Sequence, residues 1–388
     1  MSHRIIAFDN LRSIVCLAIV LYHIALCLYI FHAAQFGFSA PLDQAYFPEL
    51  PNSIYTMSIF FFSYIIFFVD IFFFLGGFFA HWVCQKKGLV HFVKNRFLRI
   101  ALPLLFYYFV SIFSYFFIYM LPKLLHGKTS FIPLISVQLK QGVMAEYFDN
   151  TSFFWFINVL LWYVLLTALL IFIRQKISFF NKFYVVANRI FQCIFGTKYF
   201  LIFIPTVIVI FLMMGHHWYL LRDTHFIPNA EILAYHAMWY VMGWCLYQHR
   251  ALFAFFQKNC GAFIFGSFIL FLIHGILFMS FYPDEAGWLY IIANAAFAFS
   301  LTLCVPGFIG LFLRYFDVRQ SLLQYVNEGS YWIYVMHVPI VSITAVLVIK
   351  NVNNYFLQFF ICFLVFLITF FPSYHWLIKK TWLRKVFC

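Results

Sequence analysis

The amino-acid sequence predicts an all-α integral membrane protein, a polytopic helix bundle of about ten transmembrane helices with both termini in the cytoplasm. Of the 388 residues, 65% are hydrophobic and only 10% are charged, which is not the composition of a soluble domain. Apolar windows of about 17 to 25 residues, enough to cross roughly 30 Å of hydrocarbon, recur along the chain. The basic residues fall mainly in alternate loops.

Ten apolar windows of this kind divide the chain, and the fifth and sixth are short. No linker, low-complexity tract or soluble domain separates them, so we expect one transmembrane domain over residues 1–388. The windows are 13–31, 57–80, 100–120, 153–173, 199–214, 233–248, 261–281, 288–311, 330–349 and 355–376.

The charge pattern predicts the orientation, because Lys and Arg favour cytoplasmic loops. Most of the 25 Lys and Arg residues precede the first window, follow the last, or lie in loops after even-numbered windows, whereas most acidic residues lie in the other loops. Both termini are therefore predicted to be cytoplasmic. The net charge of +13 indicates contact with membrane lipids and no nucleic-acid partner, because no soluble segment gathers the basic residues.

The first window carries two ionisable residues on one helix face. Arg12 and His23 are eleven residues apart, close to three helical turns, so His23 lies roughly 16 Å deeper than Arg12. Arg12 would sit at the water boundary and His23 near the middle of the bilayer. A histidine at that depth is costly without a function or a polar partner. We predict a functional His23; a histidine bonded to a neighbouring helix is the alternative.

The second window reads FFVDIFFFLGGFFAH and contains Asp70. Counted from the expected inner helix ends, Asp70 and His23 lie at a similar depth, about 15 Å. We therefore predict that Asp70 orients the His23 ring and makes it more basic; another polar partner for Asp70 is the alternative. Gly76 and Gly77 follow within two turns and would allow a close helix approach.

Arg96 and Arg99 lie where the third window begins, three residues apart and so on one helix face. Guanidinium groups bind phosphates through paired hydrogen bonds, so the two could hold a phosphorylated donor at the cytoplasmic surface. The alternative is that they only mark a cytoplasmic helix end, where the topology rule and anionic lipids favour basic residues.

Three further observations concern possible site residues. His337 lies about 10 Å into the ninth window, just before Pro339, and ranks second to His23 as a functional histidine. Trp155, at the outer start of the fourth window, fits an interfacial anchor or a substrate platform. The nine cysteines form no CxxC pair and no Cys/His metal spacing, so we expect reduced cysteines and no metal.

With these residues in order, the chain resembles the acyltransferase family 3 membrane proteins over nearly its whole length. Four segments carry the resemblance: Arg12 and His23 as R-x10-H after FDNLR, then VDIFFFLGGFF, then Arg96 and Arg99 as R-x-x-R, and finally SYWIYVMHVPI. The WF pair of the fourth window and WYVMGWCLY of the sixth are also similar to family segments. The family motif FF-x-x-SGF has a serine where this chain has Gly76, so that hydroxyl is missing.

The resemblance implies a multi-pass O-acyltransferase of the bacterial inner membrane, which moves an acyl group from cytoplasmic acyl-CoA to a carbohydrate hydroxyl on the periplasmic side. Within the family, the pattern is similar to the osmoregulated periplasmic glucan biosynthesis protein C group and to O-antigen acetyltransferases. Acetyl-CoA or succinyl-CoA would then be the donor. The motifs imply catalytic roles for Arg12 and His23, to which we add Asp70, and donor binding by Arg96 and Arg99.

Two other classes of function fit parts of the sequence. A proton-coupled glycan or lipid transporter or flippase would use His23 and Asp70 as a proton relay. A lipid-binding scaffold would need neither residue. Transfer of label from acyl-CoA to polysaccharide distinguishes the enzyme from both. The sequence indicates neither the acyl group, nor the sugar hydroxyl, nor the oligomeric state.

Overall fold

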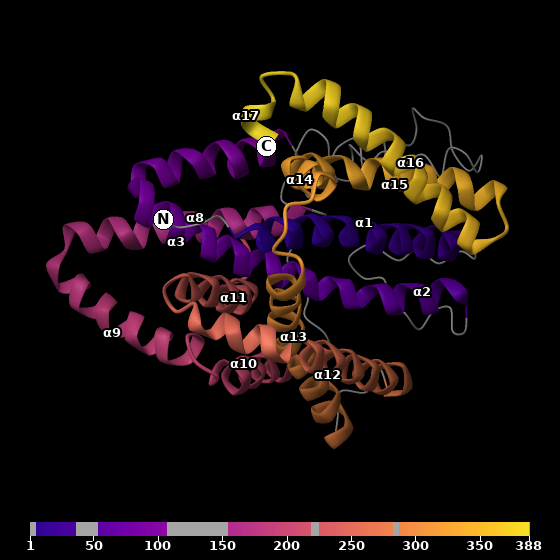
Figure 1. Ribbon diagram of the computed structural model, residues 1–388. Helices are drawn as coiled ribbons and strands as arrows, with labels where there is room; N and C mark the ends of the chain where they lie inside the picture. The colour runs from indigo at the N-terminus through magenta and orange to yellow at the C-terminus, as the bar shows by residue number, and fades with distance from the viewer. Residues whose placement is uncertain (1–4, 36–52, 107–153, 219–224, 282–286, 388) are drawn as a thin grey trace, which may run out of the picture.

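The computed structural model describes residues 5–35, 53–106, 154–218, 225–281 and 287–387, and the regular elements in these ranges are helices (Figure 1). Within the same ranges, seven helical segments are long and apolar enough to cross a membrane, or eight if the bent pair of α9 and α10 forms one span. The prediction of an all-α membrane bundle is confirmed. The number of ten spans and the side of the termini stay predictions, and residues 107–120 of the third window lie outside the described residues.

The helices keep the labels of Figure 1. The longer ones are α1 (Ile6–Gln35), α3 (Phe68–Arg96), α8 (Trp155–Lys176), α9 (Ser178–Phe195), α11 (Ala230–Gln248), α12 (Ala251–Phe281), α13 (Trp288–Tyr315), α15 (Ser330–Asn351) and α16 (Tyr355–Ser373). The shorter ones are α2 (Ile54–Ser63), η2 (Tyr64–Phe67), η3 (Phe97–Ala101), α10 (Phe200–Met214), α14 (Ser321–Glu328), η6 (Tyr374–Lys379) and α17 (Arg384–Phe387).

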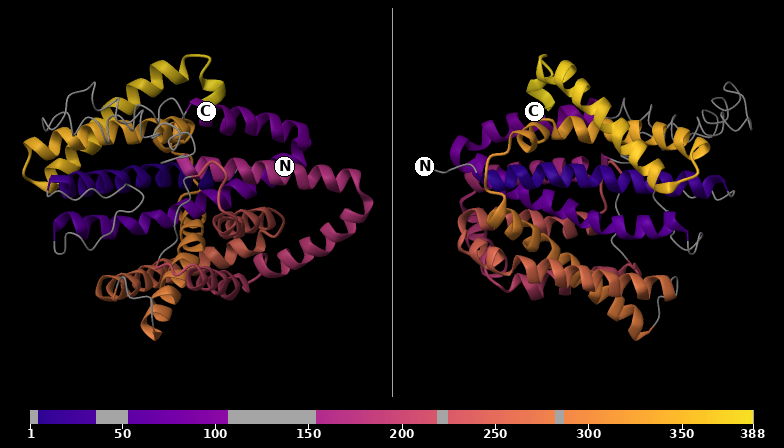
Figure 2. Two further views of the ribbon diagram at one scale, coloured as in Figure 1. Left: turned by 180° about the vertical axis from the view of Figure 1, so that it is seen from behind. Right: turned by 45° about the vertical axis from the view of Figure 1, so that its right-hand side comes forward.

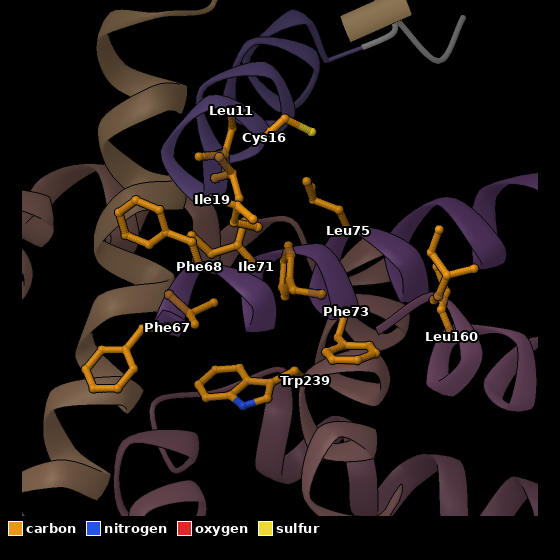
Figure 3. Close-up of a cluster of buried hydrophobic side chains, with 14 of the residues drawn as sticks. Leu11, Cys16, Ile19, Phe67, Phe68, Ile71, Phe73, Leu75, Leu160 and Trp239 are labelled. Atoms are coloured by element: carbon orange, nitrogen blue, oxygen red, sulfur yellow. The ribbon is translucent and has the colours of Figure 1, made fainter. Parts of the chain in front are cut away.

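Helix α3 lies at the centre of the buried cluster. Ile19 of α1 lies beside Ile71 on one side of α3, while Trp239 of α11 lies on another (Figure 3). All three side chains are buried. Because α1 and α11 pack on different sides of α3, residues next to each other in α3 face different neighbours.

A close backbone contact fixes α3 against α11. A Cβ added at Gly77 would lie 1.8 Å from a carbonyl oxygen of α11, and a Cβ added at Gly243 would lie 1.9 Å from a carbonyl oxygen of α3. Only glycine fits at both positions, as expected for a membrane helix crossing through small residues. The close approach predicted for Gly77 is therefore confirmed. Further along, the Nδ1 of His81 lies 2.8 Å from the Trp244 carbonyl oxygen, so the two helices run parallel.

Helix α1 packs along α14 and α15. Near its start, Ser13 donates a hydrogen bond to the Leu323 carbonyl oxygen of α14 at 2.7 Å. Towards its other end, the Cys27 sulfur lies 3.6 Å from the Ser342 hydroxyl of α15. Helices α1 and α15 therefore run parallel, with His23 beside His337 and Cys27 beside Ser342.

Helices α8 and α11 begin part-way along the bundle. In Figures 1 and 2, α2 and the second half of α1 extend beyond the starts of α8 and α11. Asn158 of α8 donates to the carbonyl oxygens of His225 and Phe226, just ahead of α11. Tyr163 donates to the Leu233 carbonyl oxygen at 2.6 Å. The first turn of α8 is thereby held beside the first turns of α11, at the level of Asp70.

Helix α3 breaks at Gly88, which has a φ of 78°, a left-handed conformation that favours glycine. The turns beyond this break end at Arg96, and η3 follows directly with Arg99. The break therefore sets the direction in which the R-x-x-R segment leaves the bundle.

Candidate active site

The first polar cluster in the bundle centres on Asp70. The Tyr235 hydroxyl donates to Asp70 Oδ2 at 2.8 Å, and His236 Nδ1 lies 2.9 Å from Asp70 Oδ1. All three residues are buried, with Asp70 only 4% exposed. A buried carboxylate is stabilised when donors satisfy both of its oxygens. We call these three residues the Asp70 cluster.

The contact with Asp70 sets the tautomer of His236. Because the carboxylate accepts from Nδ1, the proton lies on Nδ1, and Nε2 carries the basic lone pair. The His236 ring also contacts the rings of Phe73, at 4.5 Å between centroids, and Trp155, at 5.3 Å. The imidazole is thus held in one orientation by a carboxylate and two aromatic rings.

The predicted pairing of Asp70 with His23 is wrong, because Asp70 instead contacts Tyr235 and His236. Two features explain the difference. Ile19, and not His23, lies opposite Ile71, so His23 is one turn further along the bundle (Figure 3). In addition, Asp70 faces α11 while its neighbour Ile71 faces α1.

The second cluster consists of His23 of α1 and His337 of α15, whose ring centroids are 4.8 Å apart at an interplanar angle of 72°. His23 Nδ1 lies 2.9 Å from the Ile19 carbonyl oxygen, and His337 Nδ1 lies 3.0 Å from the Ile333 carbonyl oxygen. Both rings therefore carry their proton on Nδ1 and have a basic Nε2. His337 is 1% exposed, and its Nε2 has no hydrogen-bond partner within the described residues. We call these two residues the histidine pair.

Phe156 lies between the two clusters. Its ring contacts Tyr334 at 6.0 Å and Phe73 at 4.9 Å. Tyr334 in turn contacts His337 at 5.7 Å, and Phe73 contacts His236. The WF segment that begins α8 therefore touches the surroundings of both histidine sites.

Arg12 lies near the start of α1. Its Nη2 donates to the Asn327 carbonyl oxygen at 2.7 Å, and Asn327 donates to Asp9 Oδ1 at 3.1 Å. The buried Nε of Arg12 has no hydrogen-bond partner in the described part of the chain. This guanidinium keeps one buried donor available for a ligand.

Arg96 and Arg99 lie beyond the Gly88 break. Arg96 ends α3, and Arg99 belongs to the π-helical turn η3. The guanidinium carbon of Arg96 lies 5.8 Å from the centroid of the Phe92 ring. Its buried Nε also lacks a hydrogen-bond partner among the residues described. Arg12 and Arg96 therefore each have an unsatisfied N–H donor, to which an anion could bind.

Comparison with known proteins decides the class of this chain. A family model described as an acyltransferase domain matches residues 5–375. The chain belongs to acyltransferase family 3. No curated protein and no solved structure matches it.

Membership of acyltransferase family 3 makes the protein an acyltransferase, and its apolar helices make it a multi-pass membrane protein. The motifs that indicated the family lie in the helices that carry both clusters: R-x10-H in α1, VDIFFFLGGFF in α3 and SYWIYVMHVPI in α15. The position of the family serine is filled by Gly76, where an added Cβ would lie 2.9 Å from Leu160 Cδ1.

Two residues of this acyltransferase were missed in the sequence, His236 and Tyr235. Tyr235 and His236 lie four and three residues before Trp239, where the WYVMGWCLY segment begins, and His236 lies seven residues before Gly243, as Asp70 lies seven before Gly77. That matched spacing is a signal, because two helices crossing at small residues bring together side chains two turns away. No group of three or more His, Cys, Asp or Glu side chains that could hold a metal occurs in the described ranges.

Proposed function

We propose that this membrane acyltransferase moves an acetyl or succinyl group from cytoplasmic acyl-CoA to a hydroxyl of a periplasmic or cell-surface glycan, in the bacterial inner membrane. The observation that carries the proposal is the histidine pair, held in mid-helix on α1 and α15 with Arg12 three turns below His23. A basic residue near the surface and a basic nitrogen within the bundle suit a donor that has phosphates at one end and a thioester at the other.

The donor end of the proposal rests on the arginines. Coenzyme A carries a pyrophosphate and a further phosphate on its nucleotide, and guanidinium groups bind phosphates strongly. Arg12 and Arg96 each have a buried Nε without a partner among the described residues, and we assign Arg99 to the same donor site. The pantetheine arm of coenzyme A is long enough to cover the roughly 16 Å of helix rise from Arg12 to His23.

The acyl-transfer end rests on the tautomer of His23. Since its Nδ1–H is bound to the Ile19 carbonyl oxygen, the Nε2 lone pair is the nucleophilic atom of the ring. In our proposal, His23 Nε2 attacks the thioester carbon, the carbon–sulfur bond breaks, and coenzyme A leaves as its thiolate. The acyl group is then bonded to His23 Nε2, deeper in the membrane than the donor site.

The transporter alternative requires His23 and Asp70 to form one proton relay. Asp70 is paired with His236 and Tyr235, which removes the specific observation that supported this alternative. The enzyme is therefore the function we put forward.

The proposed function is tested with purified protein in lipid nanodiscs, radiolabelled acetyl-CoA or succinyl-CoA, and gluco-oligosaccharides. We expect label on the oligosaccharide with wild type and a loss of roughly 10²- to 10⁴-fold with His23→Ala. The matched control is His274→Gln, which alters a buried histidine bound to the Ala293 carbonyl oxygen away from both clusters. Mass spectrometry of surface glycans from a deletion strain then identifies the acyl group. Absence of label from the sugar with wild type and both donors would overturn the proposal.

A further inference from the structure

Donor binding and the attack of His23 on the thioester, as proposed, use none of the three residues of the Asp70 cluster. We propose that His236 is the general base that deprotonates the acceptor hydroxyl, positioned by Asp70 and Tyr235. This inference rests on the proposed function and adds the acceptor half of the reaction to it.

The orientation of His236 is that of a base. Asp70 Oδ1 binds Nδ1–H at 2.9 Å, so the lone pair is on Nε2, and no described residue donates a hydrogen bond to that atom. The Tyr235 hydroxyl satisfies the other carboxylate oxygen at 2.8 Å, which holds Asp70 itself in place. In other enzymes, a carboxylate that binds one nitrogen of an imidazole leaves the other nitrogen to take the proton of a hydroxyl nucleophile.

A purely structural clamp explains these contacts less well. Helices α3 and α11 are already joined by backbone contact at Gly77 and Gly243 and by the contact of His81 with the Trp244 carbonyl oxygen. His236 is therefore not needed to join the two helices. Its Nε2 is not one of the buried atoms that lack a partner within the described residues, so this nitrogen is open to a ligand that supplies a proton.

The neighbours of His236 fit a sugar. Trp155 is the first residue of α8 and lies 5.3 Å from His236 between ring centroids. It is partly exposed, and a partly exposed indole offers an apolar face to the C–H groups of a pyranose ring. His236 itself lies about 9 Å along α11 from Ala230, on the side predicted to face the periplasm. We therefore infer that Trp155 is a substrate platform and not only an interfacial anchor.

In this step the acceptor oxygen replaces His23 Nε2 on the acyl carbon. The acceptor O–H bond breaks, its proton moves to His236 Nε2, and the oxygen attacks the acyl carbon held on His23. A carbon–oxygen ester bond forms, the bond from that carbon to His23 Nε2 breaks, and its electron pair returns to the imidazole. His236 then releases the proton to water. Thioester and alcohol have become ester, thiolate and one proton.

The test compares two acceptors that differ in their need for a base. Gluco-oligosaccharide hydroxyls must lose a proton on attack, whereas hydroxylamine is nucleophilic without deprotonation. Wild type and His236→Gln in nanodiscs receive the same labelled acyl-CoA with either acceptor, and the uncatalysed rate is subtracted. We expect His236→Gln to lose about 10²- to 10⁴-fold of transfer to sugar and to keep transfer to hydroxylamine near the wild-type rate.

Retained hydroxylamine transfer shows that the variant is folded and binds its donor, and His274→Gln should keep both activities. The inference is overturned if His236→Gln still acylates the sugar at the wild-type rate, or if both acceptors lose rate equally. Failure of the proposed function looks different, because the wild type itself would then not acylate the sugar.

Discussion

The crossing of α3 and α11 at Gly77 offers the sharpest test of how the fold positions the site. An added Cβ at Gly77 would lie 1.8 Å from a backbone carbonyl oxygen of α11. Backbone atoms cannot rotate away as a side-chain end can, so Gly77→Ala must move one helix. Asp70 and His236 each lie two turns from this crossing, on the same two helices, and move with them.

The size of the effect follows from these distances. Carbon and carbonyl oxygen approach to about 3.3 Å, so the substitution requires a shift of about 1.5 Å at the crossing. The hydrogen bond between Asp70 and His236 is 2.9 Å long and would pass the limit of about 3.2 Å. Overpacking of this kind costs about 1–3 kcal/mol of stability, and a misplacement of about 1 Å lowers rates by about 10²-fold.

The assay combines thermal unfolding of the purified protein in detergent with acyl transfer to gluco-oligosaccharides. We expect Gly77→Ala to lower both, and Gly76→Ala to lower them much less, because the nearest atom at Gly76 is the end of the Leu160 side chain at 2.9 Å. The reasoning is refuted if Gly77→Ala unfolds at the wild-type temperature with full transfer. It is equally refuted if Gly76→Ala is the more damaging change.

Further predictions concern the donor site and the Asp70 cluster. Arg96→Ala or Arg99→Ala should raise the KM for acyl-CoA by about 10- to 150-fold, because a hydrogen bond to a charged group contributes about 1.5 to 3 kcal/mol. The KM for sugar should change little, and Lys should rescue only partly; equal changes in both KM values would favour the topological interpretation. Asp70→Asn should lower transfer to sugar but less than His236→Gln does, since the base remains but its tautomer is no longer fixed. An Asp70→Asn variant with wild-type transfer to sugar would contradict this.

Composition and apolar window length predicted the helical membrane fold correctly, because bilayer thickness constrains both directly. They could not predict that α8 and α11 begin part-way along the bundle, since window length says nothing about relative height. Helix α9 was not predicted as a helix either, because its residues were assigned to an inner loop. It is helical but lies at 99° to α10, and its charged residues Lys182 and Arg189 interrupt the apolar pattern.

The candidate site was predicted in part. His23 and His337 were both singled out from their depth in apolar windows, and the structure brings their rings together. Asp70 was singled out too, but its partner was inferred from depth alone. Depth ignores the face of the helix, and Asp70 faces α11 because Gly77 brings that helix close. The paired seven-residue spacings to glycine would have indicated His236.

Phe156 provides a last test, because its ring lies between Tyr334, beside the histidine pair, and Phe73, beside the Asp70 cluster. A large apolar side chain there should exclude water from an acyl group waiting for its acceptor. We expect Phe156→Ala to raise hydrolysis of acyl-CoA relative to sugar transfer. Phe62→Ala is the control, because Phe62 stacks on Phe359 of α16, away from both clusters. An unchanged ratio of hydrolysis to transfer would mean that Phe156 only fills space, and that water is excluded by other residues.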